Sequence, residues 1–227
     1  MIRLEQIERC FQLGDSEVHA LKQIEFSVSP GEYVSVMGPS GSGKSTLLNV
    51  LGLLDRADNG RYWLDGIETS VLKEEARARL RREKIGFVFQ SYHLVARLTA
   101  RENIELPMML AGVSPQERRD AAHRVMERLD LMDRANHLPN QLSGGQRQRV
   151  AIGRSIIMQP ELLLADEPTG NLDSRSGEEV TALLEELNAG GLTLIVVTHD
   201  VRLGARARRQ IRMLDGAISS DQPRSVE

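Results

Sequence analysis

YVSVMGPSGSGKSTLLNVL, residues 33–51, is the stretch that decides the fold. The apolar run at 33–37 leads directly into GPSGSGKST at 38–46, which fits the phosphate-loop pattern G-x-x-x-x-G-K-[ST], and a helical pattern follows. Glycines let the backbone curl so that several N–H groups point at phosphate oxygens, and the start of a helix adds positive potential. The stretch therefore predicts a strand, a loop that binds a nucleoside triphosphate, and a helix.

The side chains of this loop suit a triphosphate with its metal ion. Lys44 is expected to meet the β and γ phosphates, and the Ser45 hydroxyl is expected to bind Mg²⁺. A chance match of a Gly/Ser-rich loop is the alternative, and the order of strand, loop and helix argues against it. The predicted nucleotide-binding residues of the loop are Gly38, Ser40, Gly41, Ser42, Gly43, Lys44, Ser45 and Thr46.

Two further apolar runs, at 162–165 and 194–197, are typical of strands buried on both faces of a parallel sheet. The carboxyl ends of such strands meet at one edge, where ligands of open α/β sheets collect. Asp166 is therefore predicted to bind Mg²⁺, Glu167 to act as the base that activates water, and His199 to reach the γ-phosphate. Without the phosphate loop, a turn-forming carboxylate pair and a surface histidine would be the simpler interpretations.

The rest of the chain indicates a single α/β domain, residues 1–227, with two additions to a mainly parallel central sheet. Ile24, Phe26 and Val28 alternate with polar residues, which predicts a small antiparallel β subdomain near the N-terminus. Residues 91–158 carry helical patterns and predict an inserted helical subdomain.

Patterns near the C-terminus predict a helix, a hairpin and a frayed end. A helix with apolar residues at three- and four-residue spacing is expected from a cap at Ser174 to the glycines at 190–191. Asp215 and Gly216 predict a hairpin turn. The polar residues 217–227 are expected to fray.

Net charge and cysteine content indicate which partners and which cell compartment to expect. The chain has 29 Lys and Arg against 32 Asp and Glu, a net charge of −3, so we expect no nucleic-acid partner. Its single cysteine, Cys10, suits a reducing compartment and predicts a cytoplasmic location. No window approaches the roughly 18 apolar residues that cross a bilayer, so any action at a membrane is expected to need a partner.

The stretch NQLSGGQRQRV, residues 140–150, lies before the second apolar run. Its Ser-Gly-Gly segment precedes a helix and fits either an anion site or a simple capping turn. LSGGQ at 142–146, between the phosphate loop and LLLADE, resembles the signature of ATP-binding cassette (ABC) ATPases, and the resemblance extends over essentially the whole chain. It implies a P-loop NTPase fold that binds ATP and Mg²⁺.

The resemblance also implies how two copies cooperate. In this family two cassettes pack head to tail as a homodimer, and each ATP lies between the phosphate loop of one copy and the signature of the other. The signature residues that would meet the partner's nucleotide are Ser143, Gly144, Gly145 and Gln146.

Further family positions can be assigned one by one. Gln90 matches the glutamine that contacts Mg²⁺ or the attacking water and transmits the nucleotide state to a membrane partner. Asp173 matches an aspartate at the dimer seam, or is simply a helix cap. Phe11 occupies the position of an aromatic ring stacked on adenine, or is a core residue. His199 matches the family's switch histidine.

A finer resemblance is carried by GFVFQSYHL (86–94), RLTARENIELP (97–107) and ADEPTGNLD (165–173), which are similar to the LolD/MacB branch of lipoprotein-releasing and macrolide-efflux systems. This implies a cassette on the cytoplasmic face of the inner membrane that energises a separate integral membrane permease, with a periplasmic adaptor reached through it. Gly153 and Ser155 depart from this branch, which has alanines there, and glycine inside a helix costs roughly 1 kcal/mol against alanine.

Three other functions are weighed against that one. An ATPase of the FtsE type would signal across the membrane without moving cargo, and only the membrane partner separates it from a transporter. A soluble ABC protein acting on DNA or ribosomes would need coiled coils or a second cassette. A phosphotransferase would explain Lys44 but not residues 142–146. An ATPase subunit normally does not contact the cargo, so the sequence is compatible with a lipoprotein, a peptide, a drug or a purely mechanical signal.

Overall fold

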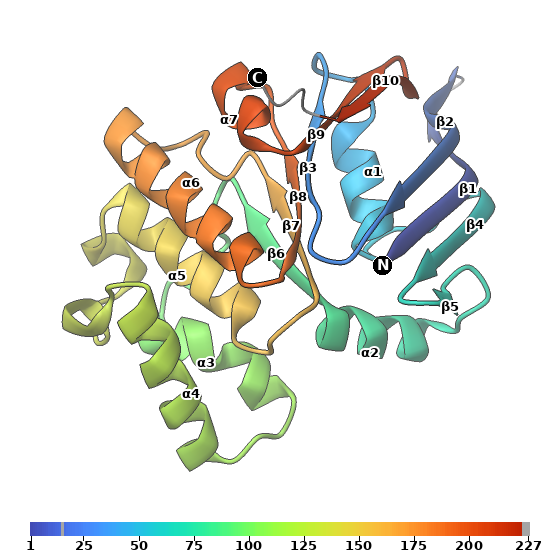
Figure 1. Cartoon of the computed structure of the whole chain (residues 1–227). Helices are drawn as coiled ribbons and strands as arrows, with labels where there is room; N and C mark the ends of the chain where they lie inside the picture. Colours follow the sequence, from blue (N-terminus) through green and yellow to red (C-terminus); the bar gives the residue numbers. More distant parts are fainter. Residues whose placement is uncertain (15, 224–227) are drawn as a thin grey trace.

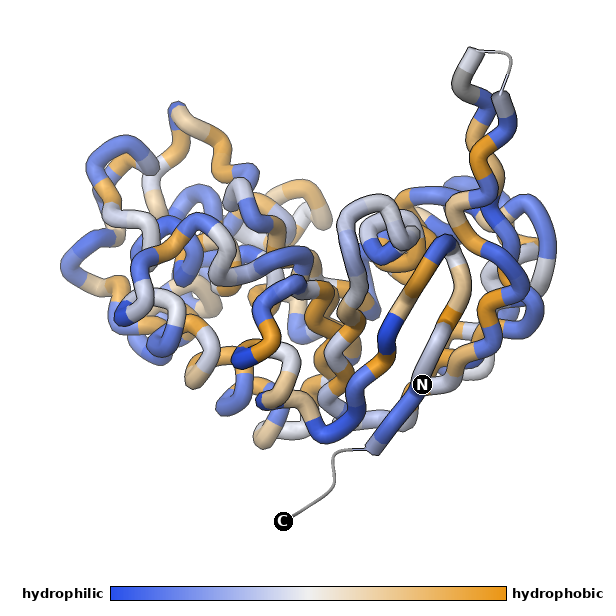
Figure 2. The backbone as a smooth tube through the Cα atoms, turned by 90° about the horizontal axis from the view of Figure 1, so that it is seen from above, coloured by the Kyte–Doolittle hydropathy of each residue, from blue (hydrophilic) through white to orange (hydrophobic). Residues whose placement is uncertain are grey.

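Two β-sheets and a group of helices make up the structure (Figure 1), a computed structural model that describes residues 1–14 and 16–223. The helices α3 to α6 lie on one side of the main sheet and the strands β1, β2 and β4 on the other (Figure 1). Figure 2 shows the backbone from above, with hydrophilic and hydrophobic residues interspersed along the chain. None of the helices in the described ranges combines the length and apolar character that a bilayer span requires.

The main sheet has the strand order β10-β9-β3-β8-β7-β6, with β3, β8 and β7 at its centre. All neighbours are parallel except β9 and β10. The three apolar runs of the sequence are these central strands, as predicted. The strands are β3 (Tyr33–Met37), β6 (Ile85–Phe89), β7 (Leu162–Asp166), β8 (Thr193–Val197), β9 (Arg209–Leu214) and β10 (Ala217–Pro223).

Both faces of the main sheet are covered by apolar cores. Leu162 and Leu164 of β7 belong to a cluster with helix α1 (Lys44–Leu51), whereas Leu163 and Ala165 belong to a second cluster with helix α6 (Ser174–Ala189). Successive residues of a strand point to opposite faces. The continuous apolar runs are therefore explained by burial on two sides.

A second, antiparallel sheet has the order β2-β1-β4-β5. Its strands are β1 (Ile2–Leu13), β2 (Ser16–Val28), β4 (Asn59–Leu64) and β5 (Ile67–Glu68). Ile24, Phe26 and Val28 are buried while their neighbours are exposed, which is the predicted alternation. Helix α2 (Glu74–Lys84) follows β5, and β6 begins at the next residue.

Between β6 and β7 the chain is helical. The elements are α3 (Ala100–Leu110), α4 (Pro115–Arg128), η1 (Met132–Arg134), η2 (Pro139–Gln141) and α5 (Gly144–Ile156). Thr99, Ser114 and Ser143 each begin a helix with a capping box, and Pro115 stands at the first position of α4. These helices pack around a separate hydrophobic core, which includes Ile104. The stretch coincides with the predicted inserted helical subdomain. A short helix, α7 (Val201–Arg206), links β8 to β9.

Close packing between helices explains why position 153 of α5 is a glycine. A Cβ at this position would lie 2.9 Å from Cδ1 of Leu129 and 3.0 Å from Cδ1 of Ile104. The missing side chain therefore lets α5 approach α3 closely, which offsets the lower helix propensity of glycine.

The expectation of a fraying tail is wrong for residues 217–223. The turn at Asp215 and Gly216 returns the chain antiparallel to β9, and the Arg209 guanidinium binds the Asp221 carboxylate at 2.5 Å. The polar residues thus form an edge strand instead of a loose end; residues 224–227 lie outside the described residues. The cap of α6 is Asp173 and not Ser174, because the Asp173 side chain accepts from the Ser176 N–H at 3.0 Å. This agrees with the interpretation of Asp173 as a helix cap.

Gly52 allows a simple test of the packing between α1 and the main sheet. Its φ of −79° suits any residue, but a Cβ there would lie 1.8 Å from Cζ of the Phe87 ring. We expect Gly52→Ala to lower the free energy of unfolding by about 1–3 kcal/mol, the usual cost of overpacking. Urea unfolding measures it.

The matched control is Gly177→Ala in α6, where the nearest heavy atom would be 3.7 Å away. We expect this variant to be stabilised by up to about 1 kcal/mol, because alanine is the better helix former. Equal midpoints for the two variants would contradict the close packing at Gly52.

Candidate active site

A cavity of about 650 Å³ opens at the carboxyl ends of β3, β7 and β8. It brings together segments that are far apart in the sequence. The predicted site residues among its lining are Gly38, Ser40, Gly41, Gly43, Lys44, Ser45, Thr46, Gln90, Asp166, Glu167 and His199. Ser42 belongs to the same loop but is buried, at 2% exposure.

The loop between β3 and α1 needs glycine at Gly43. This residue has a φ of +97°, and a Cβ on it would lie 2.3 Å from the carbonyl oxygen of Ala20 in β2. A side chain is therefore excluded both by backbone conformation and by space. The tight curve directs the first N–H groups of α1 into the cavity, where they can meet an anion.

Lys44 is held against this loop. Its Nζ donates to the carbonyl oxygens of Gly38 at 2.9 Å and Pro39 at 2.8 Å. The ammonium group thus sits beside the N-terminus of α1, and both carry positive charge. Together they make this wall of the cavity attractive to phosphate oxygens.

Asp166 and Ser45 share one part of the cavity. Burial and the neighbouring charge of Glu167 raise the pKa of the Asp166 carboxyl, while Lys44 and a hydrogen bond with the Ser45 hydroxyl act in the opposite direction. Carboxylate and hydroxyl oxygens are the ligands that Mg²⁺ prefers. The donor set therefore fits the predicted magnesium ion.

Glu167 is fixed by the residues that follow β8. Its Oε1 accepts from the backbone N–H of His199 at 2.9 Å and lies 2.6 Å from Nδ1 of the same residue, and its Oε2 accepts from the Thr198 hydroxyl at 3.1 Å. Because a carboxylate only accepts, the imidazole donates from Nδ1 in this pairing. The side chain of His199 is 74% exposed, whereas that of Glu167 is 16% exposed.

The backbone at Glu167 is strained. Its φ is +46°, a left-handed value that non-glycine residues seldom adopt, and its N–H donates to the Val197 carbonyl oxygen at 2.9 Å. Such conformations cost of order 1 kcal/mol or more and cluster at functional sites. In this conformation the carboxylate reaches the backbone and ring nitrogens of His199.

Gln90 connects the end of β6 to the segment after β7. Nε2 of Gln90 donates to Oδ1 of Asn171 at 3.4 Å, and Nδ2 of Asn171 donates to the backbone carbonyl oxygen of Gln90 at 3.0 Å. Gly170 leaves room for this contact, since a Cβ there would lie 2.7 Å from Nε2 of Gln90. Sequence reasoning missed the role of Asn171, although it quoted the motif ADEPTGNLD that contains it.

The remaining predicted residues lie elsewhere. Among the described residues, the lining of the cavity does not include Phe11, Ser143, Gly144, Gly145, Gln146 or Asp173. Ser143 caps α5, accepting from the Gln146 N–H at 3.2 Å, while Phe11 is 36% exposed with the Arg9 guanidinium 4.6 Å above its ring. Three lining residues of β2 were not predicted: Val18, His19 and Ala20. The alternation of β2 gave no sign that these residues reach the loop.

Comparison with known proteins places the chain in a family. The sequence model of the ABC transporter family matches residues 21–170, which is more than half of the chain. The chain belongs to the ABC transporter family. The family and the fold class expected from the sequence are thereby confirmed.

The cassette is similar to several curated proteins. It is 50% identical over 225 residues to the macrolide export ATP-binding/permease protein MacB of Rhodopseudomonas palustris (strain BisB18), and 49% identical over 223 residues to that of Bartonella quintana (strain Toulouse). These alignments cover 99% and 98% of the cassette but 34% of each relative, so the chain spans about a third of the length of these proteins.

Solved structures give the same result. The cassette is similar to the dimeric structure of a post-hydrolysis state of the ATP-binding cassette MJ0796 bound to ADP and Pi, with a TM-score of 0.92 and 42% identity. A second dimeric structure of MJ0796, described as a bacterial ABC transporter cassette, gives 0.92 and 43%. Both matches cover 100% of each chain.

Proposed function

We propose that the cassette binds ATP and Mg²⁺ in the cavity and hydrolyses ATP as one half of a homodimer, and that this drives a membrane permease. One observation carries the proposal: the phosphate loop, Asp166, Glu167 and His199 line a single cavity. Phosphoryl transfer needs mainly positioning and electrostatic stabilisation. The site supplies both.

The loop and Lys44 would bind the phosphates. The ammonium group would exchange its two loop carbonyl partners for β- and γ-phosphate oxygens, and Ser40, Gly41 and Thr46 line the same wall. Ser45, Asp166 and Gln90 would hold Mg²⁺, which neutralises phosphate charge when bound.

Glu167 would accept the proton of the attacking water. Its two carboxylate oxygens are oriented by the Thr198 hydroxyl and by the backbone and ring nitrogens of His199, so the group is held in place before substrate arrives. The ring of His199 is exposed to the cavity side and would contact the γ-phosphate with its other nitrogen.

The signature would act on the nucleotide of a second copy. Ser143 and the N-terminus of α5 lie apart from the described lining of the phosphate-loop cavity, which supports a site that would be completed by a second chain. A head-to-tail homodimer would bring each signature to the partner's ATP, with Asp173 at the seam and Phe11 on adenine. MJ0796 forms dimers in two solved structures.

The transport partner is inferred from the relatives. Proteins named macrolide export ATP-binding/permease proteins are 50% identical to the cassette, which favours export, efflux or lipoprotein release over the FtsE-type signalling without cargo. The cassette would then act at the cytoplasmic face of the inner membrane. It would push on an integral membrane permease, through which a periplasmic adaptor would be reached.

Ser143→Arg tests the composite site. The bulky cation would block the approach of the partner's phosphates, so the ATPase rate should fall at least about tenfold, whereas ATP binding to the monomer should change less than about twofold. A fluorescent ATP analogue and phosphate release measure the two quantities.

The matched control is Ser114→Arg, because Ser114 has the same capping box at the start of α4. It loses an equivalent cap, worth about 1 kcal/mol, without touching the signature, and should hydrolyse ATP normally. If Ser143→Arg lost ATP affinity in the monomer, the signature would belong to its own chain's site.

A further inference from the structure

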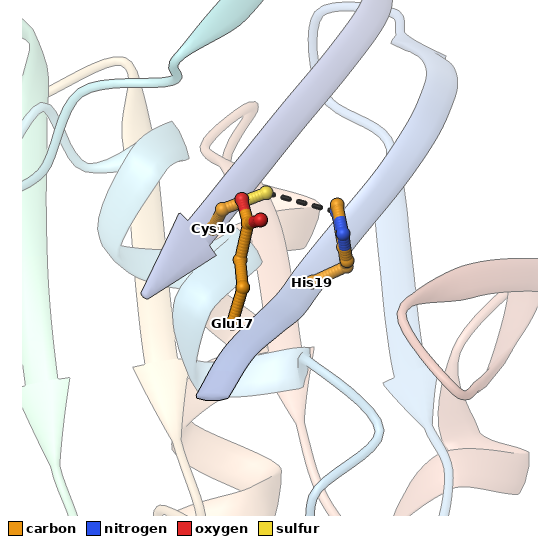
Figure 3. Close-up of side chains that lie close together, drawn as sticks. All are labelled: Cys10, Glu17 and His19. Atoms are coloured by element: carbon orange, nitrogen blue, oxygen red, sulfur yellow. Dashed lines mark hydrogen bonds between the residues drawn. The ribbon is translucent and has the colours of Figure 1, made fainter. Parts of the chain in front are cut away.

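A thiol, an imidazole and a carboxylate converge on the ribbon formed by β1 and β2 (Figure 3). Cys10 of β1 pairs directly with His19 of β2, and Glu17 stands two residues before His19 on the same strand. Because side chains two residues apart in a strand share a face, this register places the three groups together. One ligand atom from each lies within 4.8 Å of the others.

The three donors are sulfur, nitrogen and oxygen. Cys10 Sγ lies 2.9 Å from Nδ1 of His19, the contact drawn as a dashed line in Figure 3. Thiolate, imidazole and carboxylate are the ligands of Zn²⁺, whereas Mg²⁺ and Ca²⁺ take oxygen ligands. This donor set is chemically distinct from Ser45 and Asp166, which fit Mg²⁺.

The distances suit a metal ion after a small movement. In a tetrahedral site with Zn–S near 2.3 Å and Zn–N near 2.05 Å, sulfur and nitrogen are about 3.6 Å apart. Cys10 and His19 would separate by roughly 0.7 Å from their present 2.9 Å. Glu17 and His19 are exposed and Cys10 is partly exposed, so side-chain rotation can provide this without moving the core.

The cluster borders the nucleotide cavity. His19 and its neighbours in β2, Val18 and Ala20, are part of the lining of that cavity, while Phe11 follows Cys10 in β1. An ion at this place would link β1 to β2 beside the phosphate loop.

We propose that Cys10, Glu17 and His19 form a Zn²⁺ site at the rim of the nucleotide cavity. Three protein ligands leave one tetrahedral position for water or an added ligand, which is the arrangement of open zinc sites. Binding converts the thiol to a thiolate, and its proton passes to solvent.

Competition with a chromophoric chelator tests the site on the nucleotide-free cassette in reducing buffer. We expect one Zn²⁺ per chain, and we expect Cys10→Ser to weaken binding at least about 100-fold, since even the loss of outer-shell partners costs about 10–100-fold. His19→Gln and Glu17→Gln should also weaken binding.

Two control variants match these changes outside the cluster. Glu25→Gln alters another exposed carboxylate of β2, and His123→Gln alters an exposed histidine of α4. Both should bind Zn²⁺ as the unchanged chain does. Equal unfolding midpoints in metal-free buffer would show that all variants fold.

Cobalt gives a spectroscopic readout of the ligands. Co²⁺ bound to the unchanged chain should show a thiolate-to-metal charge-transfer band that Cys10→Ser lacks, and Asp166→Asn should keep both the band and the Zn²⁺ affinity. Equal Zn²⁺ affinity of Cys10→Ser and the unchanged chain would overturn the proposal. Loss of the site in Asp166→Asn would overturn it as well.

Discussion

Glu167→Gln is expected to trap an ATP-bound dimer. The amide keeps the size of the side chain, and its one oxygen can still accept from the His199 N–H, while its NH2 group takes the place of the oxygen that accepts from the Thr198 hydroxyl and can donate to that hydroxyl instead. The amide cannot take a proton from water. Turnover should fall by about 10²-fold or more, the lower range for losing a general base. ATP should still bind and bridge two chains, because Lys44, Ser45 and Asp166 are unchanged.

Size-exclusion chromatography with ATP and Mg²⁺ measures this accumulation, and phosphate release measures turnover. The unchanged chain should elute mostly as a monomer under the same conditions, as should Glu75→Gln, which makes the same change on the exposed face of α2. Turnover like that of the unchanged chain would show that Glu167 is not the general base. Loss of turnover without accumulation of dimers would contradict the hypothesis that ATP bridges two chains.

Lys44→Ala is expected to lower both ATP binding and ATP hydrolysis sharply. The substitution removes the ammonium group that lies over the loop at the N-terminus of α1. Truncating one partner of a close charge pair costs at least about 2 kcal/mol, so ATP affinity should fall about 30-fold or more. Titration with a fluorescent ATP analogue measures the affinity, and phosphate release measures the rate.

The control for this change is Lys73→Ala. Lys73 precedes α2 on the surface and its side chain makes no capping hydrogen bond, so this variant should behave like the unchanged chain. Circular dichroism should show that both lysine variants remain folded. Near-normal turnover in Lys44→Ala would mean that residues 38–46 do not bind the triphosphate.

The central strands and the phosphate loop were predictable because local rules decide them. β3, β7 and β8 are buried on both faces and therefore appear as unbroken apolar runs. The backbone conformation at position 43 requires glycine, and Gly43 is the second glycine of the phosphate-loop pattern. The edge where parallel strands end then places Asp166, Glu167 and His199 in one cavity.

Other features depend on contacts that no local pattern shows. The approach of β2 to the phosphate loop brings His19 to the cavity, but only the register with β1 and the contact of Ala20 with Gly43 determine it. Polar residues 217–223 become a strand because Arg209 and the hairpin turn hold them beside β9.

The role of the signature residues could not be tested in a single chain, because their predicted ligand is the ATP bound to a second chain. In the structure Ser143 caps α5, which is the simpler of the two interpretations that the sequence allowed. Its role toward ATP stays a prediction, because it requires the surface of a second cassette.

The most direct test of the two-chain site is the ATPase rate of a mixture of Lys44→Ala and Ser143→Arg chains. Each variant alone should hydrolyse ATP at no more than about a tenth of the unchanged rate. A mixed dimer, however, pairs the intact phosphate loop of one chain with the intact signature of the other. If half the dimers are mixed and each has one working site, the mixture should recover up to roughly a quarter of the unchanged rate. A mixture as inactive as its components would contradict the account.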